Sequence, residues 1–426
     1  MPLVNARVAV DITADIAAQA WVSIGIAPEN IARCQSVEQA LQAWQAGHYV
    51  AVDDVQHVLT LPIDLVIEAT GNPEAGARNA RLAIEAGRHV MLTSKEVDSV
   101  VGPELARRAQ AIGNVVTPVD GDQPSLLIGL ITWAQTLGFE IVSAGKSSEY
   151  DFVFDEHAGT MASNGAVIPV AEFAPLFTLG DREAQALTRA RAVACQALPQ
   201  RAVPDLCELQ VVANSTGLVV DVPGLHAPIA RPAEVPTILT TVQSGGILGT
   251  RAVLDVFHCL RRPDELSFAG GVFVVVRCED ASSWKLLQEK GHVLSRDQGH
   301  AMVYLPRHLL GLESATSVLD AVAFGESSGA QQPLPRLDLV ARATVDLRAG
   351  AMLEMGGHHH SITGVLGELR PAAALAQGSP VPFYLAANRR LLRDVPAGSL
   401  ICLEDVELDP QSELFTLRRS QDAHFF

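Results

Sequence analysis

Apolar runs without polar alternation occupy the first part of the chain, and they constrain its fold more than any other feature of the sequence. They cover residues 8–10, 63–70, 89–93 and 115–119. Between the last three runs lie the segments 74–87 and 102–113, each of helix length and each ending at a glycine, where helices commonly end. Strands that are buried on both faces and separated by helices predict a doubly wound, Rossmann-like parallel sheet in an α/β protein.

One expected part of such a sheet is absent from the sequence. A first dinucleotide-binding strand carries G-x-G-x-x-G into a helix, because the glycines let the backbone reach the pyrophosphate. No such sequence precedes Asp11. The letters RVAVDI, followed by residues 13–20, are instead typical of the second strand, whose terminal acid accepts the ribose hydroxyls. We therefore expect a sheet without its first strand, either because the start codon is assigned too late or because the chain has discarded the usual cofactor binding.

The rest of the chain predicts two further domains. Residues 121–330 mix helix-length segments with β-rich stretches and predict an α+β catalytic and dimerisation domain. The segment 327–336, SSGAQQPLPR, has the composition of a linker. Short β-like pieces between Gly and Pro turns predict a small β-rich domain at 337–420, and the dinucleotide-binding domain is expected at 1–120.

The charge balance excludes several kinds of partner. With 31 Lys and Arg against 48 Asp and Glu, the net charge of -17 opposes binding to nucleic acid or to anionic membranes. Apolar runs fall short of the roughly 20 residues that a membrane span needs, and the N-terminus lacks the features of a signal peptide. We therefore expect a cytoplasmic protein that acts on a small molecule. Its six cysteines form no C-x-x-C pair, which predicts buried reduced thiols rather than disulfides or a zinc ribbon.

Polar residues at the ends of the predicted strands are the first candidates for a binding site. In doubly wound sheets ligands lie at the carboxyl ends of the strands, so the residues that follow the run at 63–70 are expected beside a nicotinamide ribose. These residues are Ala69, Thr70, Gly71 and Asn72. Pro73, at the start of the next helix, is equally a plain structural feature. Asp11 is expected to accept both ribose hydroxyls and to repel a 2′-phosphate, which favours NAD over NADP.

Charged residues after two further strands are candidates for catalysis. Lys95 follows the run at 89–93 on the same cofactor edge; it can hold a carbonyl oxygen, or shuttle a proton if burial lowers its pKa. The alternative is a solvated surface lysine. The segment GKSSEYD places Lys146, Glu149 and Asp151 close in sequence, and a turn at the two serines could gather them around a substrate or a divalent cation. The alternative there is an ion-paired strand end.

Three later segments carry further candidates. Glu208 and Asn214 lie on a predicted helix that ends at a glycine, and Asn214 alternatively makes only local hydrogen bonds. Arg307 and His308 could meet a phosphate or carboxylate, although a lone histidine is more often structural. The histidine triplet at 358–360 resembles a metal grip. Because adjacent residues on an extended segment point to opposite faces, we interpret it as a β-turn feature.

Several long motifs together resemble a known family. They are EATGNPEAGARNA, VMLTSKEVD, VDGDQPSLL, GKSSEYD, DVPG, RHL followed by LES, and the C-terminal DVELD and LRRSQD. Nearly the whole chain resembles the homoserine dehydrogenase-like oxidoreductases with a C-terminal SAF domain. That family includes the reductoisomerase-like enzyme that makes methylerythritol phosphate from deoxyxylulose phosphate. The resemblance implies NAD(P)-dependent chemistry, a catalytic domain grown out of the Rossmann fold, and a homodimer or higher homo-oligomer formed through it.

These observations predict an NAD(P)-linked oxidoreductase that acts on a small polar hydroxy or oxo substrate. We expect Lys95 or Lys146 to position the substrate oxygen, and Glu149, Asp151 or Glu208 to move the proton or hold a metal.

Two departures from the family pattern concern the substrate. A family lysine falls at Pro204 and a family arginine at Leu305, so we do not expect turnover of deoxyxylulose phosphate, whose buried phosphate would lose its cations. Together with the missing glycine-rich loop, these departures leave an alternative open. In that alternative the chain is a degenerate, non-catalytic relative that binds a metabolite and works through regulation or assembly.

Overall fold

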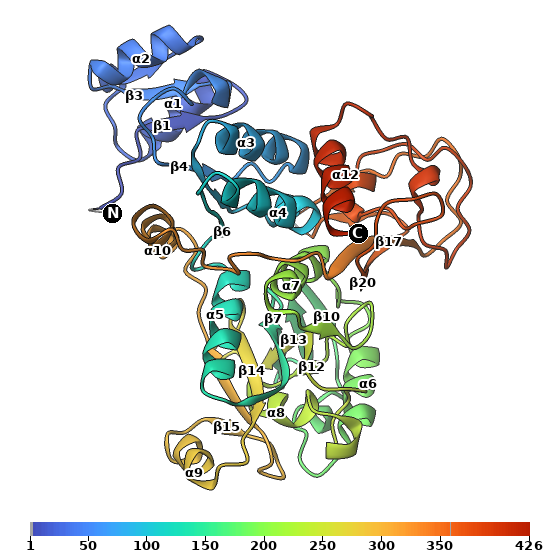
Figure 1. Cartoon of the computed structure of the whole chain (residues 1–426). Coiled ribbons are helices and arrows are strands. Elements are labelled where there is room, and N and C mark those ends of the chain that lie inside the picture. Colours follow the sequence, from blue (N-terminus) through green and yellow to red (C-terminus); the bar gives the residue numbers. More distant parts are fainter. Residues whose placement is uncertain (1–2, 358) are drawn as a thin grey trace.

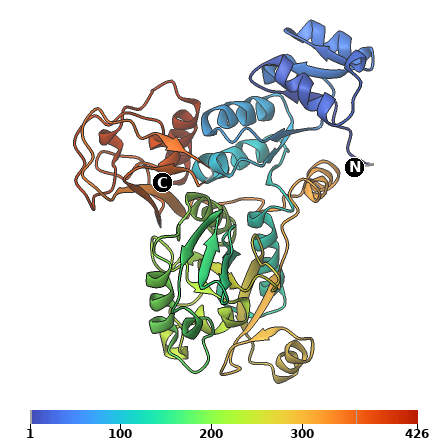
Figure 2. The same ribbon diagram turned by 180° about the vertical axis from the view of Figure 1, so that it is seen from behind.

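The computed structural model describes residues 3–357 and 359–426. Along the chain, an α/β region (blue in Figure 1) is followed by a central region with a long mixed sheet (green and yellow) and by a C-terminal module (orange to red) beside the α/β region. Figure 2 shows from behind that the mixed sheet extends away from the other two parts. The mixed α/β class predicted from the sequence is confirmed.

Short parallel strands and helices build the α/β region. One sheet has the order β1-β3-β2 and another the order β4-β5-β6, and every pairing in them is parallel. The elements of the first are β1 (Val8–Val10), α1 (Ala14–Ser23), β2 (Ile31–Arg33), α2 (Val37–Gln45) and β3 (Tyr49–Val52). Those of the second are β4 (Leu65–Glu68), α3 (Pro73–Glu85), β5 (His89–Leu92), α4 (Lys95–Gln110) and β6 (Val116–Pro118). The apolar runs therefore form parallel strands, as expected.

Local sequence and packing decide where these helices begin. Thr13 and Asn72 are N-caps whose side chains accept hydrogen bonds from backbone N–H groups of α1 and α3. Helix α4 begins at Lys95, well before the start expected at Gly102, and it contains Pro103 in its interior. Because most of α4 is buried, packing outweighs the helix-breaking tendency of that Gly-Pro pair.

The two parallel sheets are separate. Within the described residues, no hydrogen-bonded ladder joins β1 to β4, and both are edge strands. Apolar side chains on these strands are exposed to solvent, 39% for Val10 and 50% for Ile67. The sheet is thus divided at the place where the sequence predicts a missing central strand.

The central region is organised around a mixed sheet with the order β10-β9-β8-β13-β7-β14-β16-β15; β11 and β12 also pair with β13. Its strands are β7 (Glu140–Ser147), β8 (Phe152–Asp155), β9 (Thr160–Ser163), β10 (Ala166–Pro169), β11 (Val219–Val220), β12 (Ile229–Ala230), β13 (Val253–Arg261), β14 (Val272–Arg277), β15 (Val293–Leu294) and β16 (Ala301–Leu305). Its helices are α5 (Gln123–Thr136), α6 (Ala184–Ala194), α7 (Val203–Thr216), α8 (Val235–Ile238), α9 (Ala281–Glu289) and α10 (Ser314–Leu319). Helices α5 and α7 pack together and on the sheet. Residues 141–147 of β7 are buried, so a polar side chain in this strand needs a partner inside the protein.

The C-terminal module is β-rich, as the sequence predicts, and it ends in a long helix that the sequence reasoning missed. Its sheet has the order β17-β20-β19-β18. The elements are β17 (Leu337–Ala343), β18 (Met355–Gly356), β19 (Ser361–Ile362), β20 (Val365–Pro371), α11 (Phe383–Ala386) and α12 (Glu413–Phe425). Helix α12 packs on α3 and α4, and its buried Arg418 pairs with Asp338 of β17 at 2.6 Å. One helix therefore joins the module to the α/β region.

Two simpler expectations concern membranes and thiols. Among the described residues, no helix has the length and apolar character needed to cross a membrane. The cysteines of the described chain are free thiols, as expected. Four are buried and two are partly buried: Cys34, Cys195, Cys207 and Cys259, then Cys278 and Cys402.

Candidate functional site

Lys95, Lys146 and Glu208 meet where the α/β region joins the central region. Lys95 opens α4 directly after β5, Lys146 lies near the end of β7, and Glu208 lies in α7. Glu208 Oε1 accepts a hydrogen bond from Lys95 Nζ at 2.6 Å, and Glu208 Oε2 forms an ion pair with Lys146. One carboxylate thus bridges two ammonium groups that belong to different parts of the protein.

Asp205 and Ser148 extend this arrangement inside the central region. Lys146 Nζ lies 2.8 Å from Asp205 Oδ1 and donates a hydrogen bond to Gln123 Oε1 at 2.5 Å. Ser148 Oγ donates to the other oxygen of Asp205 at 2.9 Å. Asp205 lies one turn before Glu208 on α7, so both carboxylates face the same lysine.

Asp122 extends this arrangement of charges on the side of Lys95. Lys95 Nζ lies 3.2 Å from Asp122 Oδ2, and His308 Nε2 lies 3.2 Å from Asp122 Oδ1. Asp122 is also the N-cap of α5, which fixes its position. The members of this lysine–carboxylate cluster are Lys95, Lys146, Asp122, Asp205 and Glu208.

The two lysines of the cluster differ in their exposure to solvent. The side chain of Lys146 is 3% exposed, whereas that of Lys95 is 24% exposed. The three carboxylates are buried, so the ammonium of Lys95 is the charged group of the cluster that a small molecule can reach. His308, which is partly exposed, lies at the rim.

The charges inside the cluster hold one another in the ionised state. Burial alone would lower the pKa of each lysine, but the charges of Glu208 with Asp122 or Asp205 outweigh it and raise the pKa of both Lys95 and Lys146 above the ordinary value. Burial raises and Lys146 lowers the pKa of Asp205, and the net shift is downward. A pKa lowered by burial, which was the condition for Lys95 to act as a proton shuttle, is therefore not found, because its partners are two carboxylates.

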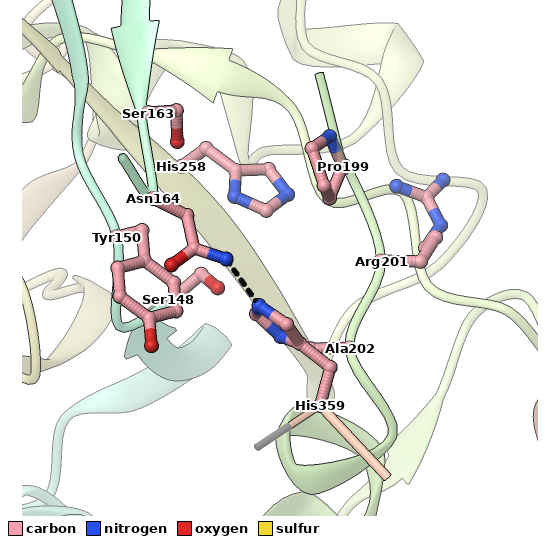
Figure 3. A pocket seen from close by; sticks show the side chains of 9 residues that line it. All are labelled: Ser148, Tyr150, Ser163, Asn164, Pro199, Arg201, Ala202, His258 and His359. Carbon is pink, nitrogen blue, oxygen red and sulfur yellow. Dashed lines mark hydrogen bonds between the residues drawn. The ribbon is translucent and has the colours of Figure 1, made fainter. Parts of the chain in front are cut away.

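A hollow of about 250 Å³, a volume that includes space open to solvent, lies next to the cluster. Figure 3 shows the side chains that line it. They are Ser148, Tyr150, Ser163, Asn164, Pro199, Arg201, Ala202, His258 and His359. Ser148 belongs to both places, since it lines the hollow and donates to Asp205. The lining of the hollow carries an arginine and two histidines, although most of its exposed surface is apolar.

Asp11 and the loop after β4 lie where the sequence places them, at strand ends. Residues 69–72 are exposed, and a Cβ added at Gly71 would meet nothing within 4 Å. The Gly71 N–H donates to Ser94 Oγ at 2.9 Å, while the Asn72 side chain caps α3. Asp11 is exposed at the end of β1, and its carboxylate accepts a hydrogen bond from the Ile12 N–H at 2.7 Å.

Glu68 is a site residue that the sequence reasoning missed. It is the last residue of β4 and is buried, with Oε1 accepting hydrogen bonds from Thr70 N–H and Thr70 Oγ at 2.8 and 2.5 Å. Glu68 Oε2 is buried without a hydrogen-bond partner within the described protein atoms. Thr70 is therefore held by this carboxylate and is not free to turn toward a ligand without breaking those bonds.

The expected grouping of Lys146, Glu149 and Asp151 is wrong. Lys146 points to α7, whereas the carboxylate of Asp151 pairs with Arg261 of β13 at 2.5 Å, and Glu149 is exposed. The reason is that Lys146 is the penultimate residue of β7, and Asp151 already lies at the start of β8, which pairs with the far end of β13. Asp151 is the ion-paired strand end of the alternative interpretation.

The structure also locates the remaining candidates. Asn214 lies on α7, whose left-handed C-cap is Gly217. The Oδ1 atom of Asn214 accepts a hydrogen bond from the Arg336 N–H at 2.8 Å, which is a structural role. Arg307 pairs with Glu313 at 3.3 Å. His359 and His360 lie in the turn between β18 and β19, as interpreted, and His358 falls outside the described residues.

A metal ion does not fit the donors present. Among the described residues, no group of three or more His, Cys, Asp or Glu side chains is arranged to hold one. Three carboxylates meet in the cluster, and there lysine ammonium groups already pair with their oxygens. We therefore derive no step from a metal.

Comparison with known proteins identifies the central region in part. Residues 202–314 match the family described as "Oxidoreductase DRL, catalytic domain". This stretch contains Asp205 and Glu208 of the cluster together with His258 and His308, whereas Lys95, Asp122 and Lys146 lie outside it. Over these residues the chain is similar to an oxidoreductase catalytic domain. No curated protein matches the sequence.

Solved structures with similar parts include reductoisomerases and other oxidoreductases. An oxidoreductase from Bacillus cereus is 11% identical, with 71% of this chain and 83% of that chain covered and a TM-score of 0.31. The 1-deoxy-D-xylulose 5-phosphate reductoisomerase from Zymomonas mobilis in complex with NADPH is 15% identical, with 47% of each chain covered and a TM-score of 0.24. A DOX-P reductoisomerase in complex with magnesium is 15% identical, with 34% of this chain and 39% of that chain covered and a TM-score of 0.23. At TM-scores this low, these likenesses carry no argument about the present chain.

Proposed function

We propose that the chain is an NAD(P)-linked oxidoreductase of the homoserine dehydrogenase-like family, with a SAF-type C-terminal module, that acts on a small polar hydroxy or oxo substrate. The observation that carries the proposal is the placement of Lys95. It begins the helix after β5, at the strand ends where a doubly wound sheet binds its cofactor, and it is joined through Glu208 to Lys146 of the central region. A substrate oxygen at Lys95 thus faces both parts of the protein.

The residues of the chain suit a reaction in which an oxygen atom gains or loses negative charge. A nicotinamide cofactor at the loop 69–72 would supply or accept the hydride. The Lys95 ammonium donates a hydrogen bond to the substrate oxygen and stabilises the charge that develops there, because its raised pKa keeps it protonated. Glu208 and Asp122 hold that ammonium in place.

A path for the proton leads from Lys95 to the surface. Asp122 lies 3.2 Å from Lys95 Nζ and 3.2 Å from His308 Nε2, and the side chain of His308 is 32% exposed. Hydride transfer to the carbonyl carbon leaves an alkoxide, which is basic enough to take a proton from the Lys95 ammonium, and Asp122 and His308 can return a proton from solvent. Lys146 is too deeply buried to touch substrate, so we assign it the positioning of Glu208 and Asp205.

We also propose a preference for NAD, a homodimer or higher homo-oligomer, and a cytoplasmic location. The exposed carboxylate of Asp11 at the end of β1 supports the first, because it would repel a 2′-phosphate. Fluorescence titration with NADH and NADPH tests this. We expect tighter binding of NADH, and Asp11→Ser should reduce the difference; tighter binding of NADPH by the unaltered protein would contradict the assignment.

Turnover tests the oxidoreductase itself. NADH oxidation is followed with a panel of small oxo acids and hydroxy aldehydes, deoxyxylulose phosphate included. We expect oxidation with a member of the panel other than deoxyxylulose phosphate, and a fall of about 100-fold or more in kcat for Lys95→Met. Lys285→Met, a change at a lysine that is 75% exposed, should leave kcat unaltered.

A non-catalytic relative is the second candidate, and the divided sheet favours it. With β1 and β4 unjoined, loop 69–72 can touch only one end of a dinucleotide. This alternative predicts weak cofactor binding and no oxidation with any substrate of the panel. Micromolar binding of NADH would exclude it.

A further inference from the structure

The C-terminal module contacts both helices that begin at the proposed cofactor edge. Glu74, in the first turn of α3, accepts a hydrogen bond from the Glu413 N–H at the start of α12, at 2.5 Å. The turn between β18 and β19 reaches the first turn of α4, where His360 Nε2 lies 3.6 Å from Glu96 Oε1. Figures 1 and 2 show the module beside these two helices. The second contact lies one residue from Lys95.

The imidazole of His360 is fixed by its own module. His360 Nδ1 lies 2.9 Å from the hydroxyl of Tyr384 in α11, and Tyr384 is buried. The Tyr384 hydroxyl also interacts with the thiol of Cys207, which precedes Glu208 on α7. When the hydroxyl donates to Nδ1, the proton of a neutral imidazole lies on Nε2, the nitrogen that faces Glu96. Both the neutral and the charged imidazole therefore present an N–H group to this carboxylate.

Glu96 lies among other carboxylates. Its side chain is 13% exposed, and this burial raises the pKa of its carboxyl. The charges of Glu68 and Glu208 raise that pKa further, whereas the charge of Lys95 lowers it. Lys95 Nζ already pairs with Glu208 and Asp122. A further carboxylate on the next residue of the helix therefore competes for the same ammonium unless another group holds it.

We propose that His360 is a positioning residue, which holds the Glu96 carboxylate so that Lys95 stays with Glu208 and Asp122 and turns toward the substrate. This rests on the proposed function in one respect, which is that the substrate oxygen lies at Lys95. Without His360, the attraction of Glu96 to Lys95 remains and draws the ammonium away from its place. The C-terminal module thus acts on the site through Glu96, and His360 itself does not touch the substrate.

The reactivity of Lys95 in the full chain tests this without any turnover. The chain has four lysines, and only an uncharged amine reacts with an acylating reagent such as an acetyl N-hydroxysuccinimide ester. Peptide mass spectrometry gives the rate at Lys95 relative to Lys285, which is 75% exposed and serves as the reference in the same sample. We expect His360→Ala to lower this relative rate about threefold or more, because the Glu96 charge then stabilises the ammonium of Lys95. Glu96→Gln should raise the relative rate, since that charge is gone.

The double variant separates positioning from mere support of the fold. Once Glu96→Gln has removed the charge, adding His360→Ala should leave the rate at Lys95 unchanged. His360→Gln keeps an N–H donor and should restore part of the rate, while His157→Ala, at an exposed histidine in the β8–β9 turn, should behave as the unaltered protein does.

Two results would overturn the proposal. One is an unchanged rate at Lys95 in His360→Ala. The other is an equal loss on adding His360→Ala with and without Glu96→Gln, because His360 would then act only by supporting the fold. If Lys95 of the unaltered protein reacts too slowly to measure, Glu96→Gln must make it reactive and His360→Ala must not reverse that; any other result also contradicts the proposal. Because the assay contains neither cofactor nor substrate, its failure is separate from failure of the oxidoreductase assay.

Discussion

Replacing Lys146 by methionine tests the electrostatic account of the cluster most directly. Methionine keeps most of the side-chain volume and removes the ammonium. The loss leaves Asp205 and Glu208, whose side chains are 8% and 5% exposed, without the cation that both contact. Lys95 still pairs with Glu208, whereas Asp205 loses its ion pair and keeps the hydrogen bond from Ser148 and the weaker electrostatic influence of His258 and Arg201.

The expected cost follows from the burial of these groups. Removing one partner of a buried ion pair destabilises a protein by about 3–5 kcal/mol, because the remaining charge is left without compensation. For a domain of about 150–250 residues, this corresponds to a fall of about 6–20 °C in the apparent melting temperature. Lys285→Met is the matched control, since Lys285 is 75% exposed and lies 3.6 Å from Glu289. We expect no measurable change for it.

The effect should depend on pH with a definite sign. In the unaltered protein the folded-state pKa of Asp205 is lowered, so its contribution is present above the unfolded value of about 4 and is lost only as the pH falls through the lower, folded value. Without Lys146, burial dominates and raises the folded-state pKa of Asp205. The stability of the variant then falls as the pH rises through that raised value.

Thermal or urea unfolding of both proteins between pH 5 and pH 8 measures this, and the deficit of Lys146→Met should be larger at pH 8. Lys146→Met with Asp205→Asn should recover part of the stability, since the unpaired charge is gone. A cost below about 1 kcal/mol, or one that does not change with pH, would refute the account, because that is the behaviour of an exposed pair.

Three other outcomes follow from the same physical chemistry. Arg418→Met should cost about 3–5 kcal/mol, because a fully buried guanidinium pairs with Asp338 and Asp422, and it should make α12 sensitive to limited proteolysis. His226 has a raised folded-state pKa, since burial is outweighed by the hydrogen bond to Asp255; its ion pair is fully present below about pH 6.5 and is lost at higher pH, so the stability difference between His226→Gln and the unaltered protein should shrink between pH 6 and pH 9. Four of the thiols are buried and two are only partly buried, so a thiol reagent should label those two in the native state and the other four only after unfolding. The two expected to react are Cys278 and Cys402.

The strands of the α/β region could be predicted from the sequence because their signal is local. An apolar run buried on both faces is visible in a few consecutive residues, as in the stretches that became β4 and β5. The start of α4 could not be predicted from the local Gly102 and Pro103. There the surrounding helices bury the segment, and that packing energy is decided by residues far away in the chain.

The candidate site shows the same division between local and distant information. Lys95 and Glu208 could each be selected because of their positions in predicted elements, yet nothing in the sequence pairs two residues 113 positions apart. Asp122 and Asp205 lie at the start of a helix, and this local signal could have selected them as candidates. The density of charges in GKSSEYD predicted one cluster, but Lys146 and Asp151 belong to different parts of the sheet and pair with different residues.

The electrostatics of the cluster and of the hollow together define a direction for the substrate. The cluster holds two ammonium groups, Lys95 and Lys146, against three carboxylates, so an anionic group placed there would meet excess negative charge. The adjoining hollow has Arg201 and histidines in its lining. An anionic end of a substrate is therefore disfavoured at the cluster, and we expect a neutral, reactive oxygen at Lys95. Bound in the reverse direction, an anionic substrate would place like charges together.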